Sequence, residues 1–226
     1  MARSRVAGFG NPRSNGCDRP DTRFMPHYGR LCGTARWSPC WHHRHHHGQG
    51  GSRSVFYENL EDVILAGTSS GGVVISKAAE LAREKIRRLV YIDALAPQPG
   101  ETVTDIVIRG PNPEPYEETE FASGPSRESM AVRLFADLQP TLKKRALDRA
   151  TLHPKGASAA NLDKFWAQHW PATVIYCTGS LNPSKAHQRR TKEKLKAHWH
   201  AIDAGHYPML SHGDETARLL MEEIGR

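Results

Sequence analysis

The residues best suited to chemistry form the run Gly67-Thr-Ser-Ser-Gly71, which matches the pattern G-x-S-x-G. An apolar run over residues 62–66 precedes the motif, and a run with helical spacing over residues 73–85 follows it. At such a strand-to-helix turn the central serine projects its hydroxyl above the sheet, and small glycines let strand and helix approach. The pattern predicts Ser69 as a nucleophile and the backbone N–H of Ser70 as an oxyanion donor. The alternative is a Gly/Ser-rich turn without chemistry.

His206 is the predicted general base, because a serine hydroxyl attacks a carbonyl only when a nearby base accepts its proton. It follows Ser69 by 137 residues and lies shortly before the last predicted helix. Nucleophile before base is the chain order typical of proteins with this kind of elbow. The chain has 13 histidines, so position rather than residue type singles out His206. We expect His198, His200 and His212 to be solvated surface groups.

The surrounding sequence predicts an α/β fold that would position these residues. A strand, a helix and a second strand within about 30 residues form a βαβ unit and therefore a parallel sheet. A long insertion, residues 94–170, is the candidate for a small helical cap, and its first part, residues 97–126, is rich in Pro, Gly, Glu and Thr and predicts a loop. The predicted strands are residues 62–66, 88–92, 173–177 and, more weakly, 198–202, and the predicted helices are residues 73–85, 127–138, 141–152, 185–196 and 215–224.

Longer stretches around these residues carry a family resemblance. Five segments are similar to the bacterial esterase branch of the α/β-hydrolases: residues 59–75, residues 88–100, Phe135-Ala-Asp-Leu138, the strand 170–177 and Gly205-His-Tyr-Pro-Met-Leu-Ser211. That branch is similar in turn to plant methylesterases and hydroxynitrile lyases. The resemblance covers residues 55–226 and places the family's histidine on His206. It implies hydrolysis of carboxylic esters through an acyl-enzyme.

The sequence departs from this branch at three places. Thr68 and Ser70 stand where the branch usually has a histidine and an aromatic residue. Ser180 occupies the usual position of the acid, although serine cannot hold a charge against the imidazolium that forms during catalysis. Asp93, at the end of the strand beside the elbow strand, is the nearest substitute acid. The alternative, which we favour on sequence alone, is that Asp93 only fixes its loop through backbone hydrogen bonds.

Residues 1–54 differ in composition from the remainder. They hold nine Arg, no Lys, two Asp and no Glu, a net charge of +7, whereas residues 55–226 are neutral overall. With one Val, one Leu and no Ile they predict disorder. The family's first strands and its His-Gly oxyanion loop are not recognisable there. We therefore hypothesise a hydrolase N-terminus translated in the wrong reading frame. A competing interpretation treats the His-rich run, residues 42–47, together with Cys32 and Cys40 as a metal-binding tail, mostly adventitious.

Together these features predict a serine esterase of small, fairly apolar carboxylic esters. No metal or organic cofactor is implied, and a small-molecule ester is the expected partner. We expect no nucleic acid partner, because the predicted folded part is neutral. No apolar run is long enough for a membrane span, and no apolar segment follows the N-terminal basic residues as in a secretory signal. We expect a cytoplasmic protein with reduced thiols, in which Cys177 is a core residue. The alternatives are a catalytically impaired hydrolase-derived protein and a hydroxynitrile lyase-like activity.

Overall fold

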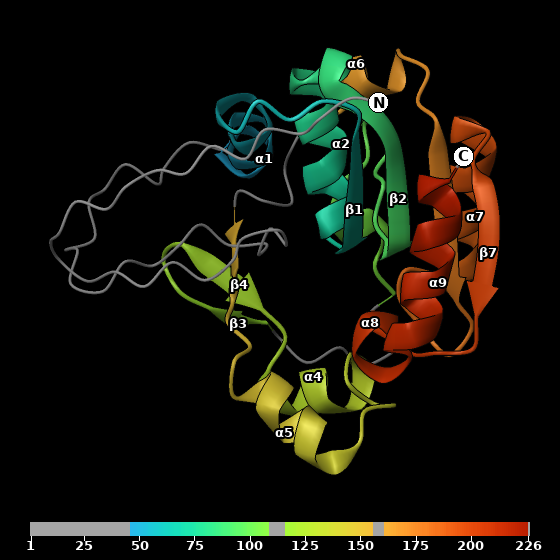
Figure 1. Ribbon diagram of the computed structural model, residues 1–226. Helices are drawn as coiled ribbons and strands as arrows, with labels where there is room; N and C mark the ends of the chain where they lie inside the picture. Colours follow the sequence, from blue (N-terminus) through green and yellow to red (C-terminus); the bar gives the residue numbers. More distant parts are fainter. Residues whose placement is uncertain (1–45, 109–115, 156–160, 226) are drawn as a thin grey trace, which may run out of the picture. The chain divides into compact units, whose positions relative to one another are not determined.

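The computed structural model describes residues 46–108, 116–155 and 161–225, and they lie in one compact unit. Its centre is a sheet of four parallel strands in the order β1-β2-β6-β7 (Figure 1). The strands are β1 (Val63–Ser69), β2 (Ile86–Ala94), β6 (Ala172–Cys177) and β7 (His198–Ile202). This arrangement confirms the α/β class and the parallel sheet. In the described residues no strand precedes β1 along the chain.

Helices cover both faces of this sheet. On β2 the buried side chains alternate, so Leu89 and Tyr91 belong to one apolar cluster and Val90 and Ile92 to the other. The first cluster includes residues of α2 (Gly71–Leu81) and α7 (Lys185–Leu195), and the second includes Leu219 of α9 (Gly213–Ile224). Burial from both sides explains why these strands are nearly continuous apolar runs. Cys177 is buried in the second cluster, as expected for a core residue.

The chain between β2 and β6 is more structured than the sequence indicates. The predicted loop 97–126 is wrong in part, because it contains α3 (Val103–Ile106), β3 (Glu117–Glu118) and β4 (Ala122–Gly124). The strands β3 and β4 form a small antiparallel sheet with β5 (His153–Pro154). Elements this short leave no periodic signal in the sequence, and here they depend on pairing between distant segments. That the insertion acts as a cap stays a prediction.

The helices of the insertion are shorter than predicted. α4 spans Arg127–Arg133 and begins where the Ser126 hydroxyl accepts the Ser129 N–H at 3.1 Å. α5 spans Pro140–Leu147, with proline in its first turn, and α6 spans Asp163–Trp166. A side-chain cap and an N-terminal proline are common helix start signals. The other short elements are the 3₁₀ helix Arg83–Lys85 and α8 (Pro208–Ser211).

The N-terminal expectation is wrong for its last residues, because a helix, α1 (His46–Tyr57), precedes β1. α1 packs against α2, and Val55 is fully buried. A Cβ added at Gly51 would lie 3.2 Å from the Ala78 Cβ, so the two helices approach closely. Tertiary packing of this kind stabilises a helix that its own sequence does not favour. Residues 1–45 lie outside the described residues, so the reading-frame hypothesis stays a prediction, to be checked by translating the other two frames upstream of codon 55.

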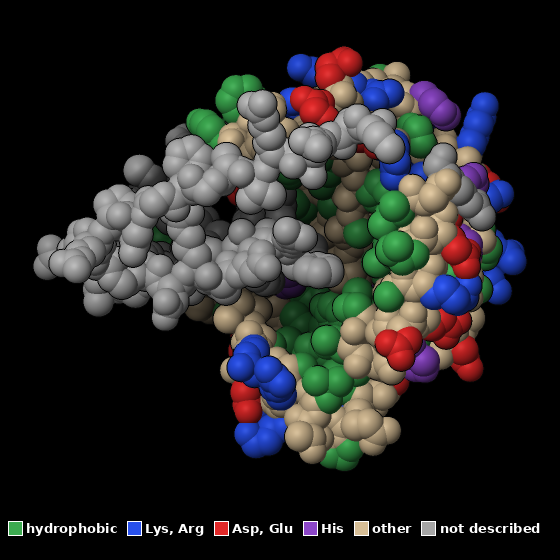
Figure 2. All heavy atoms as spheres, viewed as in Figure 1, with side chains coloured by type: hydrophobic (Ala, Val, Ile, Leu, Met, Phe, Trp, Pro, Cys, Tyr) green, Lys and Arg blue, Asp and Glu red, His purple; other side chains and the backbone are tan. Residues whose placement is uncertain are grey.

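One face of the molecule carries side chains of both charges. Acidic and basic side chains are interspersed over the face shown in Figure 2, in line with the neutral composition of residues 55–226. Among the described helices, none combines the length and the apolarity that crossing a membrane requires.

A buried carboxylate, that of Glu223, ties α9 to the sheet. It accepts from Thr173 Oγ1 at 2.6 Å and lies 3.1 Å from the Arg88 guanidinium. His198 and His200, expected as solvated groups, lie against it at 3.2 and 2.9 Å. The sequence could not show this contact, because the two histidines and Glu223 come from separate elements that meet only in the folded chain.

Removing this carboxylate is expected to be strongly destabilising. Glu223→Ala leaves the part-buried Arg88 charge without its fully buried partner, and breaking a buried pair costs up to about 3–5 kcal/mol of unfolding free energy. Urea unfolding measures the loss. Glu222→Ala is the matched control, because the exposed Glu222 pairs only with exposed Arg218 and should change stability by about 0.5 kcal/mol or less. Equal losses in the two variants would contradict the prediction.

Candidate active site

The turn at Ser69 has the geometry of a nucleophile elbow. Ser69 is the last residue of β1 and has φ 52°, a region that non-glycine residues rarely adopt. A Cβ added at Gly67 would lie 2.6 Å from the Gly71 carbonyl oxygen, and one at Gly72 would lie 2.2 Å from the Leu95 carbonyl oxygen. Both positions therefore need glycine for strand and helix to approach. A strained residue held this tightly is typical of functional sites.

Ser70 is the N-cap of α2. The first N–H groups of a helix have no partner inside the helix, and the helix dipole places positive partial charge there. The backbone N–H of Ser70 is therefore suited to the oxyanion role that the sequence predicts. The hydroxyl of Thr68 is buried and has no hydrogen-bond partner among the described residues.

Asp93 and His206 are brought together by the fold. His206 Nδ1 lies 2.7 Å from Asp93 Oδ2, and both side chains are buried, at 3% and 0% exposure. Asp93 lies where the pairing of β1 with β2 is irregular: Thr68 pairs with Ile92 and Ser69 with Ala94. Asp93 is skipped and has φ 45°. Irregularities of this kind redirect a side chain, and here Asp93 ends beside the imidazole.

Ser180, at the usual position of the acid, does not take part in this pair. Its hydroxyl donates to the Asn182 carbonyl oxygen at 3.0 Å. The sequence named Asp93 as a substitute but favoured a loop-fixing role. The structure instead shows a direct contact with the histidine ring, well within the roughly 2.6–3.2 Å reach of a catalytic hydrogen bond.

The second nitrogen of His206 is available. Nε2 is buried and has no hydrogen-bond partner in the described part of the chain. Because Asp93 accepts the proton of Nδ1, Nε2 is left as the basic nitrogen. Nε2 makes no hydrogen bond with the Ser69 hydroxyl in this structure. Hydrogen bonds between a catalytic base and its nucleophile are often long before substrate binds.

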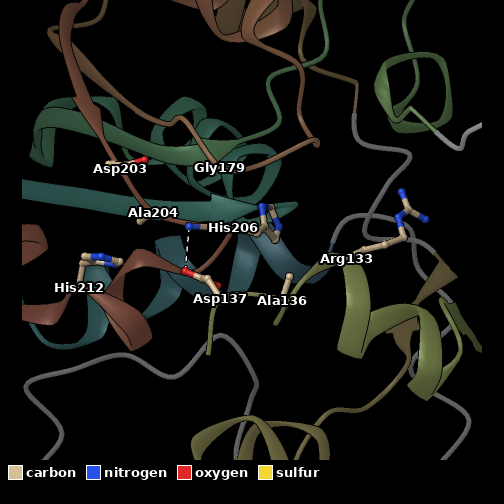
Figure 3. Close-up of a pocket in the computed structure, with 9 residues that line it drawn as sticks. Arg133, Ala136, Asp137, Gly179, Asp203, Ala204, His206 and His212 are labelled. Carbon is tan, nitrogen blue, oxygen red and sulfur yellow. Dashed lines mark hydrogen bonds between the residues drawn. The ribbon is translucent and has the colours of Figure 1, made fainter. Parts of the chain in front are cut away.

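A pocket of about 190 Å³ borders His206 (Figure 3). At its wall the Asp137 carboxylate accepts the Gly205 N–H at 2.8 Å, which connects the segment after α4 to the histidine loop. Asp137 lies in a segment with family resemblance, but we predicted no role for it, since this contact joins segments that are distant along the chain. The pocket is lined by Arg133, Ala136, Asp137, Gly179, Asp203, Ala204, Gly205, His206 and His212.

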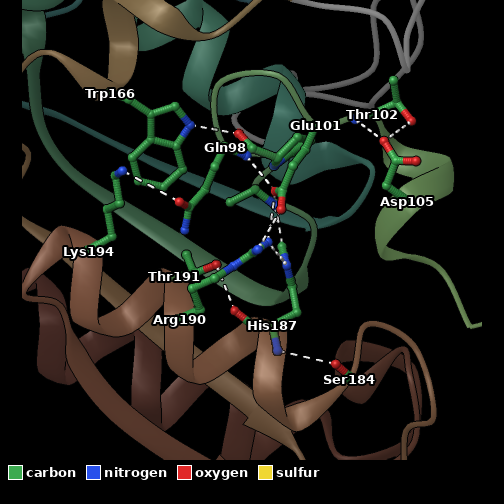
Figure 4. A network of polar contacts seen from close by, with 12 residues as sticks. Gln98, Glu101, Thr102, Asp105, Trp166, Ser184, His187, Arg190, Thr191 and Lys194 are labelled. Atoms are coloured by element: carbon green, nitrogen blue, oxygen red, sulfur yellow. Dashed lines mark hydrogen bonds and ion pairs between the residues drawn. The ribbon is translucent and has the colours of Figure 1, made fainter.

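Helix α7 holds the loop that follows Asp93 (Figure 4). His187 Nε2 accepts the Ala96 N–H at 3.1 Å. Arg190 forms a bidentate pair with Glu101, at 2.5 and 2.8 Å. The sequence indicates only a polar, basic helix here, so it misses this role. Partial burial raises the pKa of Glu101, but the contacts with Arg190 and the Gln98 N–H together outweigh burial, so the pKa is lowered.

His187 is expected to make stability depend on pH. Burial, and after it the charge of Arg190, lowers the pKa of His187 to about 4 from 6.5. Between these values the unfolded chain binds a proton that the native state excludes, so stability falls as the pH falls, by about 3 kcal/mol near pH 4. Urea unfolding of wild type and His187→Gln at pH 7 and pH 4.5 measures the loss of stability that is due to His187. The contributions of the other titratable groups are shared by both proteins and cancel in the difference. A wild-type loss no larger than that of His187→Gln would refute it.

Comparison with known sequences shows the family to which this chain belongs. The profile of the alpha/beta hydrolase family matches residues 8–219, so the chain belongs to this family. The match begins before residue 55, where we expected the resemblance to start. A carbendazim hydrolyzing esterase of Nocardioides sp. (strain SG-4G) is 44% identical over 57 residues, 25% of this chain and 24% of that protein. The chain thus matches only about a quarter of the length of that relative.

Solved structures share the fold at low identity. An extracellular alpha/beta-hydrolase from a Paenibacillus species superposes with a TM-score of 0.64 at 18% identity, covering 77% of each chain. Polyneuridine aldehyde esterase gives 0.57 at 20% identity, covering 72% of this chain and 71% of that one. The methylesterase MES16 from Arabidopsis gives 0.58 at 15% identity, covering 73% and 70%. At these identities the likeness establishes the fold, and function must be argued from the site.

Proposed function

We propose that the chain is a serine hydrolase of small carboxylic esters, with Ser69 as nucleophile, His206 as general base and Asp93 as the acid that supports it. The observation that carries the proposal is the 2.7 Å contact between Asp93 Oδ2 and His206 Nδ1, combined with the unpartnered Nε2. A buried carboxylate at Nδ1 and a free Nε2 are the arrangement that general-base activation of a serine requires.

The reaction would proceed in two halves. Ser69 Oγ attacks the ester carbonyl carbon while His206 Nε2 accepts the hydroxyl proton, and the Ser70 N–H donates to the oxyanion. Nε2 then returns the proton to the leaving alcohol as the carbon–oxygen bond breaks, which leaves an acyl-enzyme. Water, deprotonated by the same nitrogen, attacks the acyl carbon. The bond from that carbon to Ser69 Oγ then breaks, Nε2 returns its proton to Ser69 Oγ, and the carboxylic acid is released. Throughout, the Asp93 carboxylate stabilises the imidazolium and remains ionised. These steps need no cofactor or metal.

Small carboxylic esters are the proposed substrates because the family resemblance of the sequence implies hydrolysis of carboxylic esters. The pocket of about 190 Å³ borders His206, and neither Ser69 nor Ser70 is among the described residues that line it. The relative from Nocardioides, described as a carbendazim hydrolyzing esterase, supports an esterase that acts on small molecules.

Active-site labelling tests the proposal directly. A fluorophosphonate probe should modify Ser69 and no other serine, as mapped by peptide mass spectrometry, and p-nitrophenyl acetate should give a burst of acyl-enzyme. A protein that unfolds cooperatively, yet is neither labelled nor acylated, would favour the alternative of an inactive hydrolase-derived chain. Labelling at another serine would contradict the assignment of Ser69.

A further inference from the structure

The other oxygen of the Asp93 carboxylate is bound by a buried amide. Gln188, on α7, donates from Nε2 to Asp93 Oδ1 at 2.9 Å. His206 uses Oδ2, so the imidazole and the amide bind different oxygens of one carboxylate. Because a carboxylate only accepts, the amide nitrogen is the atom that faces it. Gln188 is 0% exposed.

An ordinary core position would not select this side chain. The Oε1 atom of Gln188 is buried and has no hydrogen-bond partner in the described residues. Leaving a buried acceptor unsatisfied is costly, and an apolar side chain of similar volume would avoid that cost. The amide at this position therefore indicates that its hydrogen bond from Nε2 to Asp93 Oδ1 has a function.

The backbone of Asp93 also needs an external constraint. With φ 45°, a non-glycine residue is strained, and such residues persist only where their surroundings hold them. The backbone of Gln188 is itself held, since its N–H donates at 3.1 Å to the carbonyl oxygen of Ser184, the N-cap of α7. The neighbouring His187 anchors the same loop at Ala96. Helix α7 thus fixes both the carboxylate and the chain that follows it.

We propose that Gln188 is a positioning residue for catalysis: its amide orients the Asp93 carboxylate so that Oδ2 faces His206. The inference rests on the proposed hydrolase function, and it assigns to α7 a part in the site that no feature of the sequence motif indicates.

Two variants test this role in p-nitrophenyl acetate hydrolysis. Gln188→Met keeps the volume and removes the donor, so kcat should fall about 10- to 100-fold while KM stays within about twofold. Gln188→Glu keeps the shape. Its introduced carboxyl donates to Asp93 while protonated and repels it once ionised. That variant should therefore be active at low pH and lose activity as the pH rises, giving a descending limb that wild type lacks.

Thr191→Val is the matched control, because Thr191 is buried on the same helix and its hydroxyl donates to the His187 carbonyl oxygen, not to Asp93. It should lose stability and keep wild-type kcat. The inference is wrong if folded Gln188→Met keeps wild-type kcat, or if the Gln188→Glu profile parallels that of wild type. If Gln188→Met does not fold, the Gln188→Glu profile decides.

A readout without turnover separates this inference from the proposed function. The proton on His206 Nδ1 gives a strongly deshielded NMR resonance when it is bonded to a carboxylate. Gln188→Met should shift this resonance and Thr191→Val should not. If wild type neither turns over nor is labelled, the hydrolase proposal fails, and the resonance still decides whether Gln188 orients the pair. An unchanged resonance in Gln188→Met would overturn that role.

Discussion

Replacing Ser69 with alanine is expected to lower kcat for p-nitrophenyl acetate by about 10⁶-fold, the size of loss seen when a triad nucleophile is removed. The hydroxyl is the only group at the elbow that would form the acyl-enzyme, so the remaining rate would come from binding and the oxyanion donor alone. Steady-state kinetics measure the loss, and the fluorophosphonate label should disappear with it.

A second substitution at this position separates catalysis from folding. Ser69→Gly also removes the hydroxyl, but glycine adopts φ 52° without the strain of a side chain. We expect Ser69→Gly to be as inactive as Ser69→Ala and more stable than Ser69→Ala by about 1 kcal/mol in urea unfolding. Activity retained in both variants would show that Ser69 is not the nucleophile.

Asp93→Asn should have the second largest effect, a fall in kcat of about 10⁴-fold. An amide in place of the carboxylate cannot stabilise the imidazolium. It also presents a donor to Nδ1 at 2.7 Å, which favours the tautomer that carries its proton on Nε2. His206 would then be unable to accept the proton of Ser69. The measurement is kcat at the pH optimum of wild type.

Ser180→Ala is the control for this variant, because Ser180 occupies the usual position of the acid but its hydroxyl donates to the Asn182 carbonyl oxygen and not to His206. We expect kcat to remain within about twofold of wild type, since the substitution removes no contact with the Asp93–His206 pair. A large loss in Ser180→Ala together with a small loss in Asp93→Asn would move the acid function away from Asp93.

Much of the scaffold could be predicted from the sequence because its signals are local. The apolar runs gave the four strands of the parallel sheet, and β7, the weakest of them, has the predicted limits of 198–202. The Gly-x-Ser-x-Gly run placed Ser69 at a strand-to-helix turn, and its backbone strain follows from the same few residues. The C-terminal ends of helices in the insertion were less predictable. The start of α5 at Pro140 lies one residue from the predicted start, but the helix ends at Leu147 instead of residue 152.

The sequence by itself determined the strand-to-helix turn at Ser69, the order of Ser69 and His206 along the chain, and the serine at position 180 where the family usually has an acid. Only the tertiary structure decided which carboxylate meets His206, because Asp93 precedes it by 113 residues and no local pattern encodes that contact. The choice depends on one irregularity in the pairing of β1 with β2, which skips Asp93. It depends equally on α7, because Gln188 on this helix donates to Asp93 Oδ1, the carboxylate oxygen that does not contact His206. Pairing register and helix packing are interactions between distant segments, so they exist only once the sheet has formed.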